Sequence, residues 1–136
     1  MNKISIVIVD DNPIIRTSLR NFLSLEEDMV VLGEAEGGEQ ALYFLEDLAP
    51  DILLLDMEMP GLNGLQVTAQ IRARGSPVII LIVSALLDPV HIHRVLNNGA
   101  AGYISKDELP ELLFQAIREV AGGKKEWLSP QVRAVR

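Results

Sequence analysis

The sequence predicts an α/β fold in which a five-stranded parallel sheet carries helices on both faces. Short apolar runs rich in Ile and Val alternate with segments of helical spacing. Strands that are buried on both faces of a parallel sheet read as nearly unbroken apolar runs. Because crossovers between parallel strands are right-handed and each helix must cover the sheet, this alternation indicates a doubly wound, flavodoxin-like sheet.

Five segments are expected to form the strands, in the spatial order 2-1-3-4-5. The runs at residues 4–9, 52–55 and 78–83 are the clearest, and residues 30–33 and 101–105 are weaker candidates. In this order the first and third strands are neighbours. Residues that follow them then meet at the carboxyl edge of the sheet, where open α/β sheets bind ligands.

Five helices are expected between and after these strands. Residues 64–73 and 89–98 have helical spacing without a clean apolar face, whereas the other three helices are amphipathic. Pro13, Pro89 and Pro110 each stand where a first helical residue would stand, a position that tolerates Pro. The apolar faces are Ile15, Leu19, Phe22 and Leu23 in the first helix, Ala41, Leu42, Leu45 and Leu48 in the second, and Leu109, Leu112, Leu113, Ala116, Ile117 and Val120 in the last.

Size and composition indicate one domain and exclude several kinds of site. A chain of 136 residues with 49% hydrophobic composition buries one core. The lack of Cys excludes disulfides, thiolate metal ligands and a Cys nucleophile. The apolar segment that begins after Lys3 is too short for a signal peptide, and no run reaches membrane-spanning length. We expect a soluble, cytoplasmic protein without a membrane partner.

The net charge of −7 is unevenly distributed along the chain. From Gly122 onward the chain has four basic residues and one acid, Glu126, a net charge of +3. Residues 1–121 therefore carry a net charge of −10. So acidic a body is a poor binder of nucleic acid. Contact with DNA is therefore expected only through an output domain that is absent from this chain.

Polar residues follow four of the predicted strands at the edge where ligands are expected. Asp10 and Asp11 follow the first strand, Asp56 the third, Ser84 the fourth and Lys106 the fifth. Three clustered carboxylates repel one another unless a cation holds them. Mg²⁺ suits one or two carboxylates together with water and a phosphate oxygen. We expect a shallow Mg²⁺ site that a phosphate-bearing substrate completes.

Asp56 is the candidate nucleophile toward phosphorus. The metal and the Lys106 ammonium would neutralise the charge that builds on the phosphoryl group, and the Ser84 hydroxyl can donate to a phosphate oxygen. Backbone N–H groups after Asp56 and Ser84 can add further donors, with Gly61 and Gly64 allowing a tight turn.

Each of these polar residues also has an ordinary interpretation. An acid at a strand–helix junction is usually a helix cap, which would apply to Asp10 and Asp11. Asn12, directly before Pro13, is the better cap candidate and leaves both acids free. Read alone, Asp56 would be an ordinary carboxylate at the start of a loop, Lys106 a solvated surface lysine and Ser84 a helix cap.

Taken in order, these residues resemble the response-regulator receiver family of two-component systems, which has the CheY-like fold. The resemblance rests on Asp10-Asp11, on Asp-Met-Glu-Met-Pro-Gly-Leu-Asn-Gly at 56–64, on Ser84-Ala85 and on Lys106, and it covers about residues 4–121. It implies a phosphorelay switch that takes a phosphoryl group from a sensor histidine kinase and can form a homodimer on phosphorylation. Such a receiver catalyses only its own phosphorylation and dephosphorylation.

The resemblance implies which residues form the metal and phosphate site. Asp56 would accept the phosphoryl group. Asp10 and Asp11 would hold Mg²⁺ together with Asp56 and the backbone carbonyl of Glu58. The backbone N–H groups of Glu58 and Ala85 would contact the phosphate.

The resemblance also implies a conformational switch. Ser84 would move toward the phosphate, Lys106 would pair with the phosphate charge, and the rotamer of Tyr103 would follow Ser84. We expect this to bias a two-state face formed by the fourth helix, fifth strand and fifth helix. The family often has Pro with a cis bond after the Lys, but Asp107 follows here, so no cis-Pro loop is predicted there.

Residues 122–136 form a tail that differs from the predicted receiver, residues 1–121. A Gly122-Gly123 break precedes a short polar stretch with the single Trp, Trp127, which either packs back on the domain or is exposed. The tail resembles the linker by which receivers of the NarL/LuxR type join a C-terminal helix-turn-helix domain. We expect a truncated regulator of transcription in preference to a stand-alone receiver.

Two other functions stay open on the residues alone. A phosphatase with an aspartyl-phosphate intermediate would use Glu58 as general acid, although such enzymes place the nucleophile after the first strand and carry a capping insertion. A flavodoxin-like cofactor binder would share the fold. Its first turn would need to cradle phosphate, whereas Asp-Asp-Asn-Pro is acidic. Turnover of phosphomonoesters would identify the first alternative, and flavin colour the second.

Overall fold

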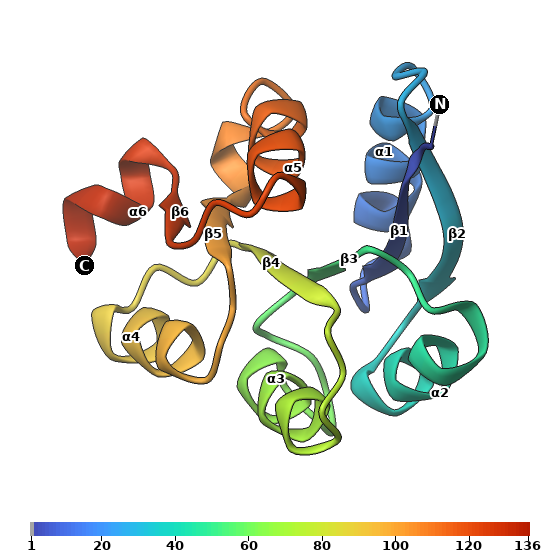
Figure 1. Cartoon of the computed structure of the whole chain (residues 1–136). Helices are drawn as coiled ribbons and strands as arrows, with labels where there is room; N and C mark the ends of the chain where they lie inside the picture. Colours follow the sequence, from blue (N-terminus) through green and yellow to red (C-terminus); the bar gives the residue numbers. More distant parts are fainter. Residues whose placement is uncertain (1) are drawn as a thin grey trace.

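A computed structural model describes residues 2–136, so Met1 lies outside the described residues. The described chain forms one parallel sheet in the order β2-β1-β3-β4-β5-β6 (Figure 1). The predicted order 2-1-3-4-5 is confirmed, and a short sixth strand extends it. The strands are β1 Ile4–Val9, β2 Met29–Ala35, β3 Ile52–Leu55, β4 Ile79–Ser84, β5 Gly102–Ser105 and β6 Trp127–Leu128.

Helices cover both faces of the sheet, and side chains alternate along each strand between two apolar cores. Val7 and Val9 of β1 face the core beneath α2, α3 and α4, whereas Ile6 and Ile8 face the core beneath α1 and α5 (Figure 1). No helix within residues 2–136 is long and apolar enough to cross a membrane. The helices are α1 Pro13–Leu23, α2 Gly38–Leu48, α3 Gly64–Ala73, α4 Pro89–Asn97, α5 Leu113–Ala121 and α6 Pro130–Val135.

The start of α1 confirms the interpretation of Asn12 as the helix cap. The Asn12 side chain accepts hydrogen bonds from the N–H groups of Ile14 at 2.9 Å and Ile15 at 3.4 Å, and Pro13 takes the first helical position. Asp88 and Pro89 begin α4 in the same way. Because Asn12 supplies the cap, Asp10 and Asp11 are not used for it.

The predicted start of the last helix at Pro110 is wrong. Residues Lys106–Glu108 form a single 3₁₀ turn, Leu109 is extended with φ −84° and ψ 148°, and α5 begins only at Leu113. Pro110 drives Leu109 out of the α region, which is compatible with a helix that begins at Pro110. Residues 109–112 form a turn instead, in which the Leu113 N–H donates to the Pro110 carbonyl at 3.1 Å, an i→i+3 bond in place of a helical i→i+4 bond. The Leu109–Pro110 peptide bond is cis.

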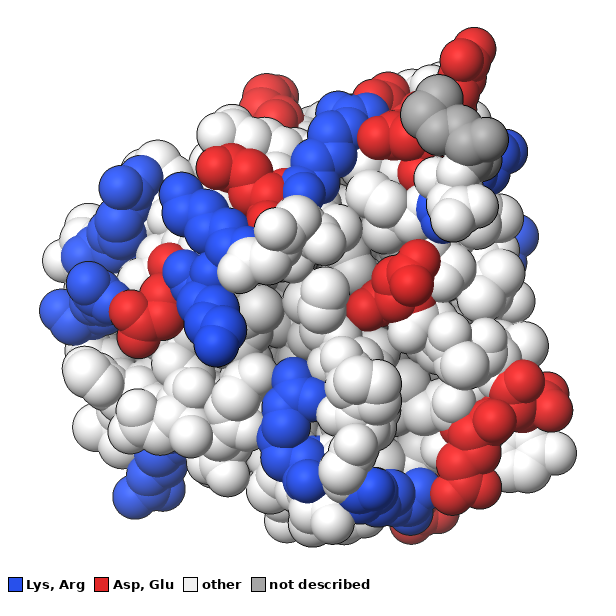
Figure 2. All heavy atoms as spheres, viewed as in Figure 1, with Lys and Arg blue, Asp and Glu red and all other residues white. Residues whose placement is uncertain are grey.

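The region expected to be a tail folds back onto the sheet. Trp127 and Leu128 are 7% and 6% exposed, and the Trp127 indole N–H donates to Glu119 at 2.8 Å. Gly102 permits this approach, because a Cβ built on it would lie 2.5 Å from the Trp127 carbonyl oxygen. Basic side chains are prominent on the side of the molecule that carries α6 (Figure 2), which agrees with the predicted concentration of basic charge after Gly122.

Candidate functional site

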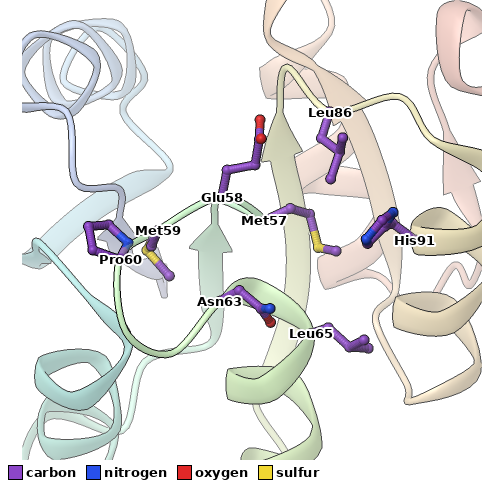
Figure 3. Close-up of a pocket in the computed structure, with 8 residues that line it drawn as sticks. All are labelled: Met57, Glu58, Met59, Pro60, Asn63, Leu65, Leu86 and His91. Carbon is purple, nitrogen blue, oxygen red and sulfur yellow. The ribbon is translucent and has the colours of Figure 1, made fainter.

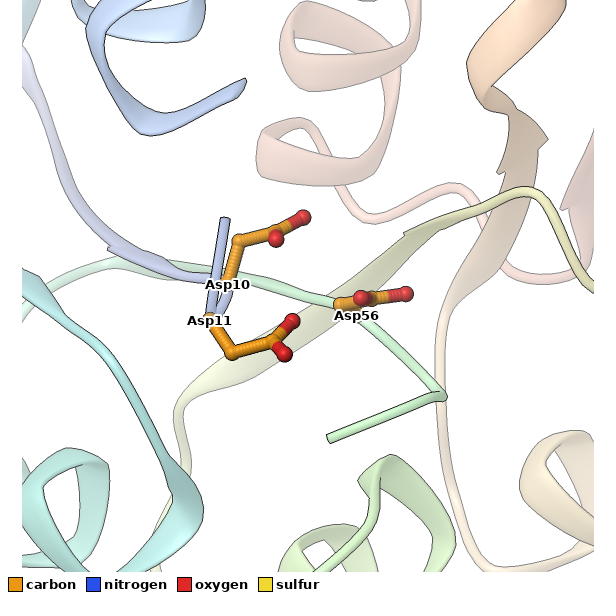
Figure 4. Close-up of side chains that lie close together, drawn as sticks. All are labelled: Asp10, Asp11 and Asp56. Atoms are coloured by element: carbon orange, nitrogen blue, oxygen red, sulfur yellow. The ribbon is translucent and has the colours of Figure 1, made fainter. Parts of the chain in front are cut away.

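Three carboxylates meet at the carboxyl edge of the sheet. Because Val9 of β1 is paired with Leu55 of β3, the next residues, Asp10 and Asp56, leave the sheet side by side. One carboxylate oxygen from each of Asp10, Asp11 and Asp56 lies within 4.8 Å of the others (Figure 4). The structure thus brings together the three acids that the sequence predicted from strand order.

The three acids differ in burial. Asp10 and Asp56 are 2% and 4% exposed, whereas Asp11 is exposed and opens the cluster to solvent. Three carboxylate oxygens at this separation form a hard, oxygen-only donor set, which suits a hard divalent cation and not a soft metal. The triad can therefore hold a metal ion that enters from the Asp11 side.

Lys106 supplies a positive charge to the buried acids. Its Nζ lies 2.8 Å from Asp10 Oδ2 and 3.3 Å from Asp56 Oδ2. Burial lowers the pKa of Lys106, but its hydrogen bond to Asp10 and the charges of both acids outweigh burial, so the net pKa is raised. Lys106 is therefore a fixed cation that bridges the ends of β1 and β3.

The pKa of Asp56 is raised above its ordinary value. Burial of the carboxyl is the main cause, the charge of Lys106 opposes it, and the charge of Asp10 adds to it. Burial and the neighbouring Asp10 charge therefore both destabilise the ionised form of Asp56. Any added positive charge, such as a bound metal ion, would stabilise the ionised carboxylate.

The loop from β3 to α3 shapes the surroundings of Asp56. The Glu58 N–H donates to Asp56 Oδ1 at 3.3 Å, and Gly61 adopts a φ of +76°, as a tight turn requires. Gly64 was expected to allow a tight turn, but the structure gives it a different role. A Cβ on Gly64 would lie 2.6 Å from the Asp56 carbonyl oxygen and 2.8 Å from the Met57 Cα, so only Gly lets α3 begin this close to β3.

We expect Gly64→Ala to destabilise the protein by about 1–3 kcal/mol, because the added methyl group must displace backbone and not a flexible side chain. The matched control is Gly122→Ala, where φ is −80° and the nearest atom lies 3.4 Å from the new Cβ. That variant is expected to lose no stability. Urea unfolding of both variants measures the difference, and equal unfolding midpoints would refute the close-approach role of Gly64.

Ser84 and Tyr103 both hold the loop after β4. Ser84 is fully buried, and its Oγ accepts the Leu86 N–H at 3.1 Å. Tyr103 is also fully buried, and its hydroxyl donates to the Leu86 carbonyl. Burial is the main cause of a raised Tyr103 pKa. A displacement of Ser84 would therefore reach Tyr103 through Leu86. The role of Leu86 could not be predicted from the sequence, because Leu86 acts through its backbone.

A cavity of about 500 Å³ lies beside the acidic cluster, between the β3–α3 loop and the start of α4 (Figure 3). Its walls are mostly apolar, with Met57, Leu65 and Leu86 among them, and Glu58 stands at its edge. Asp10, Asp11 and Asp56 do not line it. The chemistry of the site is therefore in the shallow acidic cluster and not in this cavity.

A doubly wound sheet with an acidic metal-binding cluster and a lysine at its carboxyl edge places the chain in the CheY-like class of α/β domains. Residues 6–118 match the family model of the response regulator receiver domain. The chain belongs to this family: it is a receiver domain of two-component regulators, a signalling module and not an enzyme in its own right. Family membership thus decides against the phosphatase and the flavin binder.

The chain resembles named regulators that are longer than itself. It is 36% identical over 133 residues to the nitrate/nitrite response regulator protein NarL of Escherichia coli (strain K12), an alignment that covers 96% of this chain and 62% of that protein. It is 33% identical over 129 residues to the response regulator GacA of Pseudomonas aeruginosa, covering 95% and 60%. The chain therefore spans about 60% of the length of these relatives.

Solved receiver structures have the same fold. The signal receiver domain of NarL from Mycobacterium tuberculosis superposes with a TM-score of 0.87 at 35% identity and covers 91% of this chain and 100% of that one. The isolated receiver domain of RcsB from Salmonella enterica serovar Typhimurium, in the presence of the phosphomimetic BeF₃⁻, gives a TM-score of 0.90 at 26% identity, covering 98% and 99%.

Proposed function

We propose that the carboxylate of Asp56 accepts a phosphoryl group from the phosphohistidine of a sensor histidine kinase. The observation that carries this proposal is the position of Asp56: it is 4% exposed, joins Asp10 and Asp11 in one cluster, and lies 3.3 Å from the Lys106 ammonium. A carboxylate surrounded in this way can act as a nucleophile while neighbouring positive charge stabilises the transferred group.

In the proposed transfer, an Asp56 carboxylate oxygen forms a bond to phosphorus as the phosphorus–nitrogen bond of the phosphohistidine breaks. The imidazole leaves and takes a proton from solvent. Lys106 would stabilise negative charge on the phosphoryl oxygens. The Ser84 hydroxyl and the N–H groups of Glu58 and Ala85 would donate to the same oxygens.

We propose Mg²⁺ as the metal ion of this site. Asp10, Asp11, Asp56 and the backbone carbonyl of Glu58 would hold it. When bound, it supplies positive charge that neutralises the carboxylates and the phosphoryl oxygens during transfer. The donor set supports this choice, because all side-chain ligands are carboxylate oxygens and the exposed Asp11 leaves room for the waters that Mg²⁺ retains.

A small phosphodonor tests this proposal without the kinase. With acetyl phosphate and Mg²⁺, we expect the wild-type chain to gain one phosphoryl group, detected by intact-protein mass spectrometry. Removal of Mg²⁺ with EDTA is expected to slow uptake by at least about tenfold, because the charge that the metal supplies is worth several kcal/mol. Equal rates of uptake with Mg²⁺ and with EDTA would show that the acidic cluster does not act through a metal ion.

We further propose that the switch acts in the cytoplasm and controls transcription through an output domain beyond residue 136. The named relatives are response regulators of which this chain spans about 60%. In this proposal residues 1–121 are the receiver, residues 122–136 lead to the output domain, and DNA is contacted only by that domain. A homodimer formed on phosphorylation is a further proposal, which sedimentation of the phosphorylated chain would test.

A further inference from the structure

The C-terminal segment, residues 127–136, lies against β5, the strand that leads into Lys106 (Figure 1). β6 pairs with β5 in parallel, with Leu128 opposite Tyr103. Leu128 and the fully buried Val132 belong to the same apolar cluster as Tyr103 and Ile92 of α4. The outer edge of β5, part of the predicted two-state face, is therefore covered by the chain's own segment.

Two hydrogen bonds attach the junction of β6 and α6 to β5. The Ser129 N–H donates to the Tyr103 carbonyl at 3.2 Å, and the Ser105 N–H donates to Ser129 Oγ at 3.4 Å. Both serines are buried. Because a buried polar group that loses its partner is costly, Ser129 must follow a movement of residues 103–105.

A third contact joins the C-terminal segment to the turn that begins at Lys106. Glu108 Oε2 accepts the Gln131 N–H at 3.3 Å. The other carboxylate oxygen, Oε1, is shut off from solvent and has no hydrogen-bond partner within residues 2–136. This contact is long and half-satisfied, so a small shift of the turn can strengthen or break it.

Two routes thus run from the acidic cluster to the same short stretch of backbone. Lys106, which contacts Asp10 and Asp56, begins the 3₁₀ turn that ends at Glu108 and its contact with Gln131. In the second route, Ser84 accepts a hydrogen bond from the Leu86 N–H and Tyr103 donates one to the Leu86 carbonyl. The Tyr103 carbonyl in turn accepts the Ser129 N–H. Both routes end within residues 129–131.

We propose that the C-terminal segment reads the state of the acidic cluster, and that phosphorylation of Asp56 tightens its attachment to β5. The inference rests on the proposed function of Asp56. A phosphoryl group would draw both Lys106 and Ser84 toward itself. Each then restricts one of the two routes, so the contacts of Ser129 and Gln131 become more persistent. The predicted two-state face is in this way contacted by a segment of the same chain.

Amide hydrogen exchange of the 136-residue chain, with and without Mg²⁺ and BeF₃⁻, tests the proposal. We expect the amides of residues 129–132 to exchange at least about fivefold more slowly with the phosphoryl mimic, because their opening becomes less frequent. The NMR shifts of the Glu58 and Ala85 amides report occupation of the acidic cluster in the same sample. Emission from Trp127, the single Trp, gives a second readout of the segment.

Three variants test whether the two routes carry the response to the C-terminal segment. Glu108→Ala removes the contact with Gln131, so the slowing at residues 131–132 is expected to disappear while the Glu58 and Ala85 shifts persist. Glu111→Ala alters an exposed acid on the same connection and is expected to behave as wild type. Ser129→Ala tests the second route in the same way and replaces a buried hydroxyl without adding bulk.

The outcomes distinguish this inference from the function on which it rests. Responses at Glu58 and Ala85 without any slowing at residues 129–132 would overturn the inference and leave the phosphoacceptor proposal intact. Slowing that survives unchanged in both Glu108→Ala and Ser129→Ala would overturn the assigned routes. A lack of response at Glu58 and Ala85 would overturn the proposed function together with the inference.

Discussion

Asp56→Asn is expected to reduce phosphoryl uptake from acetyl phosphate by at least about a thousandfold, because it removes the nucleophile and leaves only the surrounding charges. Asn has nearly the size of Asp and keeps an acceptor oxygen for the Glu58 N–H, which contacts Asp56 Oδ1 at 3.3 Å. The fold is therefore expected to be retained. Stoichiometry of bound phosphate, measured by intact-protein mass spectrometry over time, provides the comparison.

Asp107→Asn is the matched control for this variant. Asp107 is an exposed acid that directly follows Lys106, so it alters local charge near the site without removing a member of the acidic cluster. We expect its uptake to stay within about twofold of wild type, as for surface substitutions. Stable uptake by Asp56→Asn at the wild-type stoichiometry would show that another residue accepts the phosphoryl group.

Lys106→Met is expected to slow phosphoryl uptake by about 100-fold and to destabilise the protein by about 3 kcal/mol at pH 7. The rate falls because a preorganised cation at the transferred group is lost. The stability falls because two carboxylates that are only 2% and 4% exposed lose their shared cation. Lys125→Met makes the same substitution at an exposed lysine and is expected to change neither the uptake rate nor the stability.

The stability deficit of Lys106→Met is expected to depend on pH. Burial raises the folded-state pKa of Asp56 above its ordinary value of 3.8, and loss of Lys106 raises it further. The protonated carboxyl therefore stabilises the fold fully below about pH 3.8, and this contribution is lost as the pH rises through the folded-state pKa. The deficit should shrink as the pH is lowered from 7 toward 4. Urea midpoints that differ from wild type equally at all pH values would contradict this electrostatic origin.

The acidic cluster could be predicted because its members are set by strand ends. The apolar runs of β1 and β3 end at Val9 and Leu55, and the order of the sheet then decides that Asp10 and Asp56 are neighbours. Lys106 follows from the same rule at the end of β5. The cap at Asn12 follows from its place before Pro13, because helix capping depends on local sequence, and its side chain accepts the Ile14 and Ile15 N–H groups in the structure.

Other features depend on contacts that no sequence pattern encodes. β6 has two residues, too few for a recognisable period, and its place beside β5 depends on the lack of a side chain at Gly102. The start of α5 could not be predicted, because Pro110 has the sequence position of a first helical residue although residues 109–112 form a turn. Leu86 serves Ser84 and Tyr103 through its main chain, so its residue type carries no signal.

Localisation of the phosphoryl group in the wild-type chain tests the role of Asp56 most directly. After reaction with acetyl phosphate and Mg²⁺, borohydride reduces an aspartyl phosphate to homoserine, which peptide mass spectrometry assigns to a single residue. We predict this product at Asp56 alone. Homoserine at Asp10 or Asp11, or a borohydride-resistant phosphate on Ser84, would contradict the assignment of Asp56 as the phosphoacceptor.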